Sequence, residues 1–144
     1  MEKILISACL VGDKVKYNGG DNLSSKIDAL LEKYELIPFC PEVEGGLSIP
    51  RSPCEKVGDR IMNMDGEDVT DEFYKGAELA FNICLFMKIK IAILKEKSPS
   101  CGSKIIYDGS FSHKEISGMG VTAAYLKEKG ITIYNEDEID SLLK

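Results

Sequence analysis

Four short apolar runs constrain the fold of this chain more than any other feature. Within the segments between these runs, the apolar residues recur at helical rather than strand spacing. The runs occupy residues 4–6, 35–39, 89–94 and 131–134. Continuous apolar runs of this length are typical of strands buried on both faces of a parallel sheet. We therefore predict four core strands.

The segments between these runs carry apolar residues at helical spacing. They cover residues 22–34, 71–87 and 118–126, and a short closing helix is expected at 139–143. Asn22 is a fair N-cap for the first helix, and Gly130 is placed to end the third. Alternating strands and helices predict an α/β fold, a single-domain Rossmann-like three-layer sandwich over residues 1–144 with a mostly parallel sheet of about four strands plus a small hairpin. Right-handed crossovers would place the carboxyl ends of all strands at one edge.

Charge and composition exclude several classes of protein. Apolar residues make up 44% of the 144 residues and charged residues 29%, which is an ordinary globular balance. The formal net charge is −6, and no basic cluster is long enough for a broad phosphate-binding surface, so we expect no nucleic-acid or membrane partner. The N-terminus runs directly into the first strand without an apolar signal segment, so we expect a cytoplasmic protein.

Two stretches do not fit the alternating pattern. Residues 43–66 contain repeated Gly and Pro residues and no convincing helix, and a loop of this length is usually functional or weakly ordered. Its Arg51, Lys56 and Arg60 are either solvated charges or contacts for an anionic group or substrate. Residues 104–111 contain Asp108-Gly109 between two short apolar segments, which predicts the small hairpin.

Three of the five cysteines follow predicted strand ends. Cys9 and Cys40 come directly after the first and second strands. Cys101 belongs to Ser98-Pro99-Ser100-Cys101-Gly102, a run that changes abruptly from strand to turn after the third strand. We therefore expect the three thiols to meet at one sheet edge and to form a metal centre with an open position, holding either zinc or an iron–sulfur cluster.

The remaining cysteines and the single histidine carry weaker signals. Cys84 falls on the apolar stripe of its helix and is expected to be a buried structural thiol. Cys54 lies in the irregular stretch, where it is either an incidental thiol, a fourth ligand or a transient sulfur acceptor. His113 lies among polar residues of the hairpin and is expected at the surface.

Six segments, in order along nearly the whole chain, resemble the DUF523 family, whose characterised members include thiouracil desulfurases. They are Ser7-Ala8-Cys9-Leu10-Val11-Gly12, Tyr17-Asn18-Gly19-Gly20, Cys40-Pro41-Glu42-Val43, Gly66-Glu67-Asp68-Val69-Thr70, Leu94-Lys95-Glu96-Lys97-Ser98-Pro99-Ser100-Cys101-Gly102 and Gly120-Val121-Thr122-Ala123. The Ser-Pro-Ser-Cys-Gly run is the most specific of these motifs.

The resemblance implies a [4Fe-4S] cluster on Cys9, Cys40 and Cys101, whose fourth iron is free to take the sulfur of a substrate. It also implies catalytic roles for Glu42, as general base, and for Ser100, which would orient the substrate or the attacking water. The expected substrate contacts come from the same motif loops and are Lys16, Tyr17, Asn18 and Ser98.

Some positions depart from the family pattern. Family members commonly have Arg and Asp where this chain has Lys16 and Asn18, and usually Ala near Cys54. A lysine does not reproduce a bidentate guanidinium contact, and a neutral Asn18 changes the charge of the loop beside Cys9. These changes bear on the identity of the substrate and not on the cluster.

The expected activity is removal of sulfur from a thiolated nucleobase such as 2-thiouracil, with water supplying the new oxygen, sulfide leaving and no net redox change. Two other interpretations keep a metal at this site: a non-catalytic sulfide carrier or redox sensor, and a zinc hydrolase with three cysteine ligands. A purely structural α/β domain with incidental thiols is the fourth interpretation.

Overall fold

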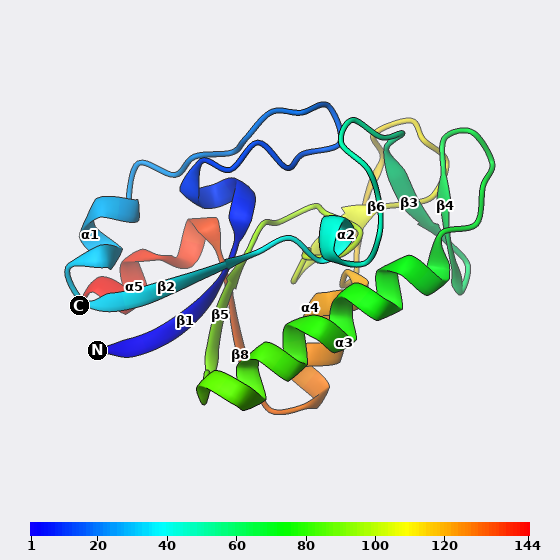
Figure 1. Ribbon diagram of the computed structural model, residues 1–144. Coiled ribbons are helices and arrows are strands. Elements are labelled where there is room, and N and C mark those ends of the chain that lie inside the picture. The colour runs from blue at the N-terminus through cyan, green and yellow to red at the C-terminus, as the bar shows by residue number, and fades with distance from the viewer.

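A sheet of four parallel strands forms the centre of the computed structural model, which describes residues 1–144 (Figure 1). Its order is β2-β1-β5-β8. The strands are β1 (Glu2–Ser7), β2 (Tyr34–Phe39), β5 (Ile91–Leu94) and β8 (Thr132–Asn135). Each overlaps one of the four apolar runs, so the prediction of four core strands in a parallel sheet is confirmed.

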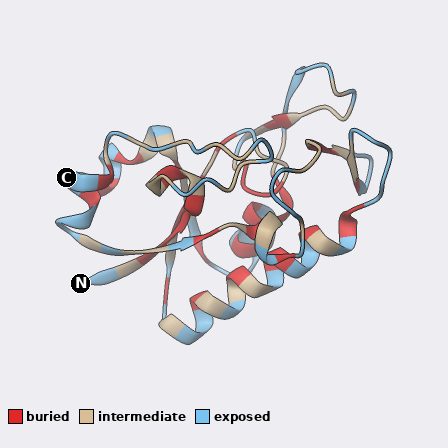
Figure 2. Ribbon diagram, turned by 45° about the horizontal axis from the view of Figure 1, so that its top comes forward, coloured by how far each residue is buried: buried red, intermediate tan, exposed pale blue.

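Helices cover both faces of this sheet, which confirms the three-layer architecture (Figure 1). On one face, α3 (Thr70–Met87) and α4 (Val121–Glu128) pack against Leu5, Ala92 and Leu94. On the other face, α1 (Ile27–Leu31) and α5 (Asp140–Leu143) pack against Ile4, Ile6 and Ile93. Neighbouring strand residues therefore point into opposite cores, and the buried side of α3 faces the sheet (Figure 2).

The first helix is shorter than the apolar spacing predicts. It begins at Ile27 and not after Asn22, and Tyr34 already belongs to β2. The backbone N–H groups of Asn22 and Ser24 donate to the carbonyl oxygens of Cys9 and Leu10, both at 2.9 Å. Residues 22–24 are thus tied to the 3-10 turn η1 (Ala8–Val11), and these hydrogen bonds hold them in the loop that precedes α1.

The structure contains two hairpins where the sequence predicts one. The unpredicted hairpin pairs β3 (Cys54–Val57) with β4 (Arg60–Asn63) inside the stretch expected to be irregular. The expected hairpin pairs β6 (Ile105–Tyr107) with β7 (Glu115–Ser117), so Asp108-Gly109 begins a long loop and is not the turn. Both hairpins lie beyond the carboxyl edge of the sheet (Figure 1).

Two further short helical turns each follow a strand of the parallel sheet. The turn α2 (Pro41–Glu44) follows β2, and η2 (Glu136–Glu138) follows β8. Gly130 has a φ of 92° just after α4, which confirms its predicted role in ending that helix. No helix is long and apolar enough to span a membrane.

Candidate metal centre

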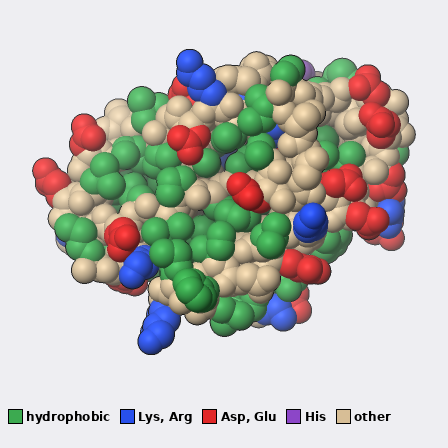
Figure 3. All heavy atoms as spheres, in the orientation of Figure 1, with side chains coloured by type: hydrophobic (Ala, Val, Ile, Leu, Met, Phe, Trp, Pro, Cys, Tyr) green, Lys and Arg blue, Asp and Glu red, His purple; other side chains and the backbone are tan.

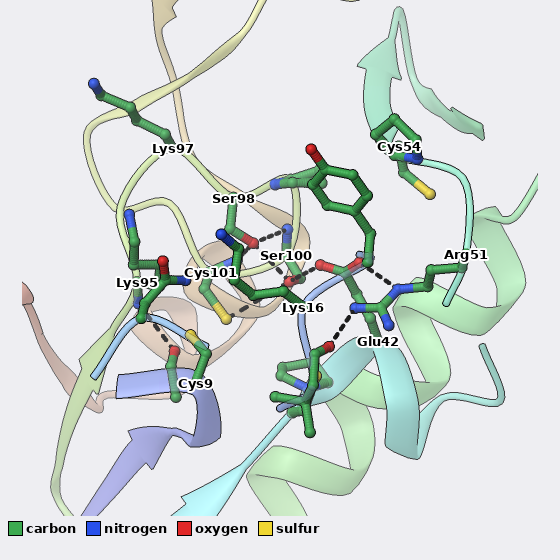
Figure 4. A pocket seen from close by; sticks show the side chains of 18 of the residues that line it. Cys9, Lys16, Glu42, Arg51, Cys54, Lys95, Lys97, Ser98, Ser100 and Cys101 are labelled. Atoms are coloured by element: carbon green, nitrogen blue, oxygen red, sulfur yellow. Dashed lines mark hydrogen bonds and ion pairs between the residues drawn. The ribbon is translucent and has the colours of Figure 1, made fainter. Parts of the chain in front are cut away.

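Cys9, Cys40 and Cys101 line one cavity of about 450 Å³ at the carboxyl edge of the sheet. Cys9 lies in η1 directly after β1, Cys40 directly follows β2, and Cys101 lies in the loop after β5. The predicted convergence of the three strand ends is therefore confirmed. Figure 4 shows the sulfur atoms of Cys9 and Cys101 turned toward the same space.

The loop of Cys101 is held by hydrogen bonds from within and from α4. The Ser98 hydroxyl oxygen accepts the backbone N–H groups of Ser100 (3.1 Å) and Cys101 (3.0 Å). The carbonyl oxygen of Ser100 accepts the N–H of Thr122, at 2.8 Å, in the first turn of α4. A Cβ atom on Gly120 would lie 2.5 Å from the Ser100 carbonyl carbon, so only glycine permits this approach.

The turn that carries Cys40 and Glu42 is fixed against α3. Pro41 occupies the first position of α2, where its missing N–H costs no hydrogen bond. A Cβ atom on Gly76 of α3 would lie 2.0 Å from the Pro41 carbonyl oxygen. The backbone of α2 therefore sits directly on α3, and this contact positions both Cys40 and Glu42.

The three thiols influence one another. Burial raises the pKa of Cys101 to about 12; hydroxyl groups of Ser7 and Ser100 oppose this, and the nearby Cys40 and Cys9 add to it. Burial also raises the pKa of Cys9 and of Cys40. Three neighbouring thiolates are unfavourable on their own, whereas a metal centre supplies the positive charge that deprotonates a coordinating thiol. The donor set therefore fits a thiolate-bound metal centre.

The spacing of these donors distinguishes kinds of metal centre. No three His, Cys, Asp or Glu side chains lie close enough together to hold a single ion. Sulfur ligands of one zinc ion lie about 4 Å apart, because each Zn–S bond is about 2.3 Å. In an iron–sulfur cluster each thiolate binds a different iron, so the thiolates lie farther apart. The lack of a three-donor group at single-ion spacing is compatible with a cluster held by the three thiolates.

A hydrogen-bonded chain leads from Ser98 to Arg51 along the cavity wall (Figure 4). Because the Ser98 oxygen already accepts two N–H groups, its own hydroxyl donates to the Ser100 oxygen at 2.9 Å. The Ser100 hydroxyl donates to Glu42 Oε2 at 2.8 Å. Arg51 Nε donates to Glu42 Oε1 at 3.3 Å, and the Glu42 and Arg51 side chains are only 14% and 8% exposed.

The structure brings most of the expected substrate contacts to this cavity. Lys16, Tyr17 and Ser98 line it. Lys16 lines the cavity and has no carboxylate partner, whereas Lys97 pairs with Glu115 at 2.9 Å and points away from the other labelled residues (Figure 4). Asn18 lies outside the cavity because its side chain accepts the N–H of Gly20 at 2.9 Å and shapes the loop.

Of the two further cysteines and the histidine, Cys84 lies in the core, whereas Cys54 and His113 line the cavity. Cys84 is buried in the core, as expected. Cys54 is also buried and lines the cavity, but Figure 4 shows it across the space from Cys9 and Cys101. Burial raises its pKa to about 12, with Glu42 and Arg51 as the nearest charges and no other thiol among its influences. His113 is exposed, as expected, yet it also lines the cavity.

Two residues of the site have no assigned role in the sequence prediction. Ser7 accepts the Lys95 N–H at 2.9 Å and donates toward Cys101, and its position before the first cysteine is the only sequence signal for this. Arg51 is singled out only as one of three loop cations. Of the other two, Arg60 forms an exposed ion pair with Asp68 at 2.8 Å, and Lys56 lies outside the cavity.

A buried carboxylate, Glu96, holds the loop that leads to Cys101. It is 7% exposed and accepts the N–H groups of Ser103 (2.8 Å), Lys104 (3.0 Å) and Ile105 (3.1 Å). Asn135 of β8 donates to its second oxygen at 2.6 Å. Burial works to raise the pKa of Glu96, but these hydrogen bonds outweigh it and lower the pKa from 4.5 to about 2.

We expect the variant Glu96→Gln to lose about 3 kcal/mol of stability at pH 7, because an amide replaces the charged acceptor of these N–H groups. A depressed pKa stabilises the fold above pH 4.5 and this contribution declines as the pH falls toward 2, so the difference from the wild type should shrink below pH 4.5. Urea denaturation between pH 7 and pH 3 measures this. Glu78→Gln, an exposed change on α3, is the control, and a constant difference across this range would contradict the prediction.

Three comparisons with known proteins show what this chain is similar to. A family model described as 2-thiouracil desulfurase matches residues 4–138. The protein YbbK of Bacillus subtilis (strain 168) is 41% identical over 150 residues, covering 97% of this chain and 99% of YbbK. A solved structure, the [4Fe-4S]-dependent thiouracil desulfidase TudS (DUF523Vcz), is 46% identical with a TM-score of 0.93, covering 99% of this chain and 95% of that chain.

Proposed function

Because the chain belongs to the 2-thiouracil desulfurase family, we propose that it is a [4Fe-4S]-dependent desulfidase that converts a thiolated nucleobase such as 2-thiouracil, with water, into the oxo base and hydrogen sulfide. The cluster would be held by Cys9, Cys40 and Cys101. The observation that carries this proposal is the meeting of these three thiols with the Glu42–Ser100 pair in one cavity. The similar solved structure supports the choice of cofactor.

A cluster with three protein ligands leaves one iron open, and when bound it supplies a Lewis acid that polarises the C–S bond of the substrate. Glu42 acts as the general base and takes a proton from the water that attacks the thiocarbonyl carbon. The Ser100 hydroxyl, which donates to Glu42 Oε2, holds this carboxylate in place and lies next to Cys101. Glu42 passes this proton to the departing sulfur, and the proton left on the added oxygen also moves to sulfur as the new carbonyl forms, so both protons of the water leave in hydrogen sulfide and Glu42 is again a carboxylate.

Arg51 positions the general base. Its guanidinium donates to Glu42 Oε1 (3.3 Å), to the Val15 carbonyl (3.0 Å) and to the Ser48 carbonyl (3.2 Å), and its backbone N–H donates to the Tyr17 carbonyl (2.8 Å). It therefore joins Glu42 to the loop that carries Lys16 and Tyr17. With Arg51 on one oxygen and Ser100 on the other, Glu42 is held in one orientation.

Lys16 and Tyr17 are the proposed substrate contacts on this loop. The Lys16 ammonium has no carboxylate partner and is available to donate to a carbonyl oxygen of the base. Ser98 has a supporting role, because its hydroxyl group is committed to the turn and to Ser100. Asn18 is left out of the proposed site since its side chain shapes the loop.

The proposed setting is the cytoplasm. All five cysteines are free thiols, which suits a reducing compartment. The proposed partner is a small molecule and not a nucleic acid. Figure 3 shows the Lys and Arg side chains of one face as separate spots among acidic groups, so this face offers no continuous basic surface.

The proposal is tested by anaerobic reconstitution with iron and sulfide, followed by incubation with 2-thiouracil. We expect a brown protein with broad visible absorption, and release of uracil and sulfide in equal amounts. Protein that has not been reconstituted is the control and should release neither product. A brown protein that releases neither product would overturn the desulfidase proposal. A colourless protein that binds zinc would overturn the assignment of a [4Fe-4S] cluster as the cofactor.

A further inference from the structure

Part of the cavity wall comes from an aromatic segment of the β6–β7 hairpin. Tyr107, Phe111 and His113 all line the cavity, and all come from the β6–β7 hairpin. We call residues 107–113 the aromatic segment. None of its side chains holds the proposed cluster or contacts Glu42, so the reaction described above gives it no role.

The backbone of this segment has an unusual conformation. Phe111 and His113 have φ angles of 58° and 60°, in the left-handed region that residues other than glycine rarely adopt. Only two other non-glycine residues have positive φ, and one of them, Lys97 (68°), lines the same cavity. Conformations of this kind persist where the surroundings impose them, and they concentrate at functional sites.

A buried carboxylate imposes the conformation. Glu55 of β3 is 7% exposed and accepts the N–H groups of Gly109 (2.9 Å) and Phe111 (3.1 Å). The rings of Tyr107 and His113 meet edge to face, with centroids 5.7 Å apart and planes at 86°. The aromatic segment is therefore anchored to the β3–β4 hairpin through Glu55, and this contact fixes the backbone that carries its rings.

We propose that the aromatic segment determines specificity by recognising the flat heterocyclic ring of the substrate, an inference that rests on the proposed function. The faces of nucleobases stack on aromatic side chains, and each such stack contributes strongly to binding. The thiols, Glu42 and Ser100 act on the thiocarbonyl unit, which open-chain compounds also contain. Beyond the carbonyl contact proposed for Lys16, discrimination in favour of a ring requires side chains that contact the face of that ring, and the aromatic segment supplies them.

The test compares 2-thiouracil with thiourea, which has the same N–C(=S)–N unit without a ring, in the reconstituted protein. Each substrate takes up one water and releases one hydrogen sulfide. The variants Phe111→Leu and Tyr107→Leu each replace an aromatic ring with an apolar side chain. Phe111 has a positive φ, whereas Tyr107 lies in strand β6, so Tyr107→Leu provides the test if Phe111→Leu does not fold. Tyr74→Leu, at a 47% exposed tyrosine of α3 outside the cavity, is the control.

We expect both ring-deleting variants to bind uracil about ten-fold more weakly in equilibrium dialysis, and to lose a similar factor in kcat/KM for 2-thiouracil. Turnover of thiourea and the uracil affinity of Tyr74→Leu should stay within about two-fold. Unchanged uracil affinity, or an equal loss for both substrates, would overturn the inference. A wild type that binds uracil but releases no sulfide would overturn the proposed function and not the role of the aromatic segment.

Discussion

The variant Cys101→Ser should lose the cluster and, with it, all sulfide release above background. Cys101 is 4% exposed and lies among Ser7, Ser100 and the other two thiols, so no neighbouring donor is placed to replace it. A serine hydroxyl is a harder and much less acidic ligand than a thiol, and it does not hold iron in such a site. Iron content should fall from about four atoms per chain to near zero, which iron analysis and visible absorption of the reconstituted variant measure.

Two other cysteine variants serve as matched controls. Cys84→Ser changes a buried thiol of α3 in the core, and Cys54→Ser changes a buried thiol that lines the cavity away from the other three. Both should keep the cluster, and Cys9→Ser and Cys40→Ser should lose it as Cys101→Ser does. A normal spectrum for Cys101→Ser, or loss of the cluster in Cys54→Ser, would show that the ligand set is wrong.

The variant Glu42→Gln should keep the cluster and lower the rate of sulfide release by about 10²- to 10⁴-fold, the range expected for a lost general base. The amide has nearly the shape of the carboxylate and still accepts from Ser100, but it cannot take up the proton of the attacking water. Single-turnover release of sulfide and uracil from 2-thiouracil measures the effect, with the visible spectrum as evidence of a loaded site.

Glu44→Gln is the control for this change, because Glu44 lies two residues along the same turn α2 and is exposed outside the cavity. Its rate should equal that of the wild type. If Glu42→Gln with a normal spectrum turned over within about two-fold of the wild type, Glu42 would not be the general base.

The parallel sheet and the meeting of the three thiols could be predicted from the sequence because both depend on local patterns. An apolar run predicts a buried strand, and parallel strands bring their carboxyl ends to one edge. Cys9 and Cys40 need no more information than their place after such a run. The 18-residue helix α3 is predictable for the same reason, since its apolar face repeats over many turns.

The features that the sequence does not predict depend on partners far away in the chain. Asn22 looks like a helix cap, but its N–H donates to Cys9 in another segment. Arg51 looks like one loop cation among several, and only its contact with Glu42 and with two carbonyl groups separates it from Arg60. The β3–β4 hairpin follows closely on Pro50 and Pro53, which favours an irregular interpretation of the whole stretch.

The origin of the three thiols in three separate strand–helix units has a consequence for biogenesis. Cys9 and Cys40 are 31 residues apart, and Cys101 follows 61 residues later, so no short stretch of nascent chain contains a complete ligand set. The sheet order places β5, whose loop carries Cys101, next to β1, and this pairing forms only after α3 has crossed over. We therefore expect a cluster on these three proposed ligands to load only onto a folded sheet.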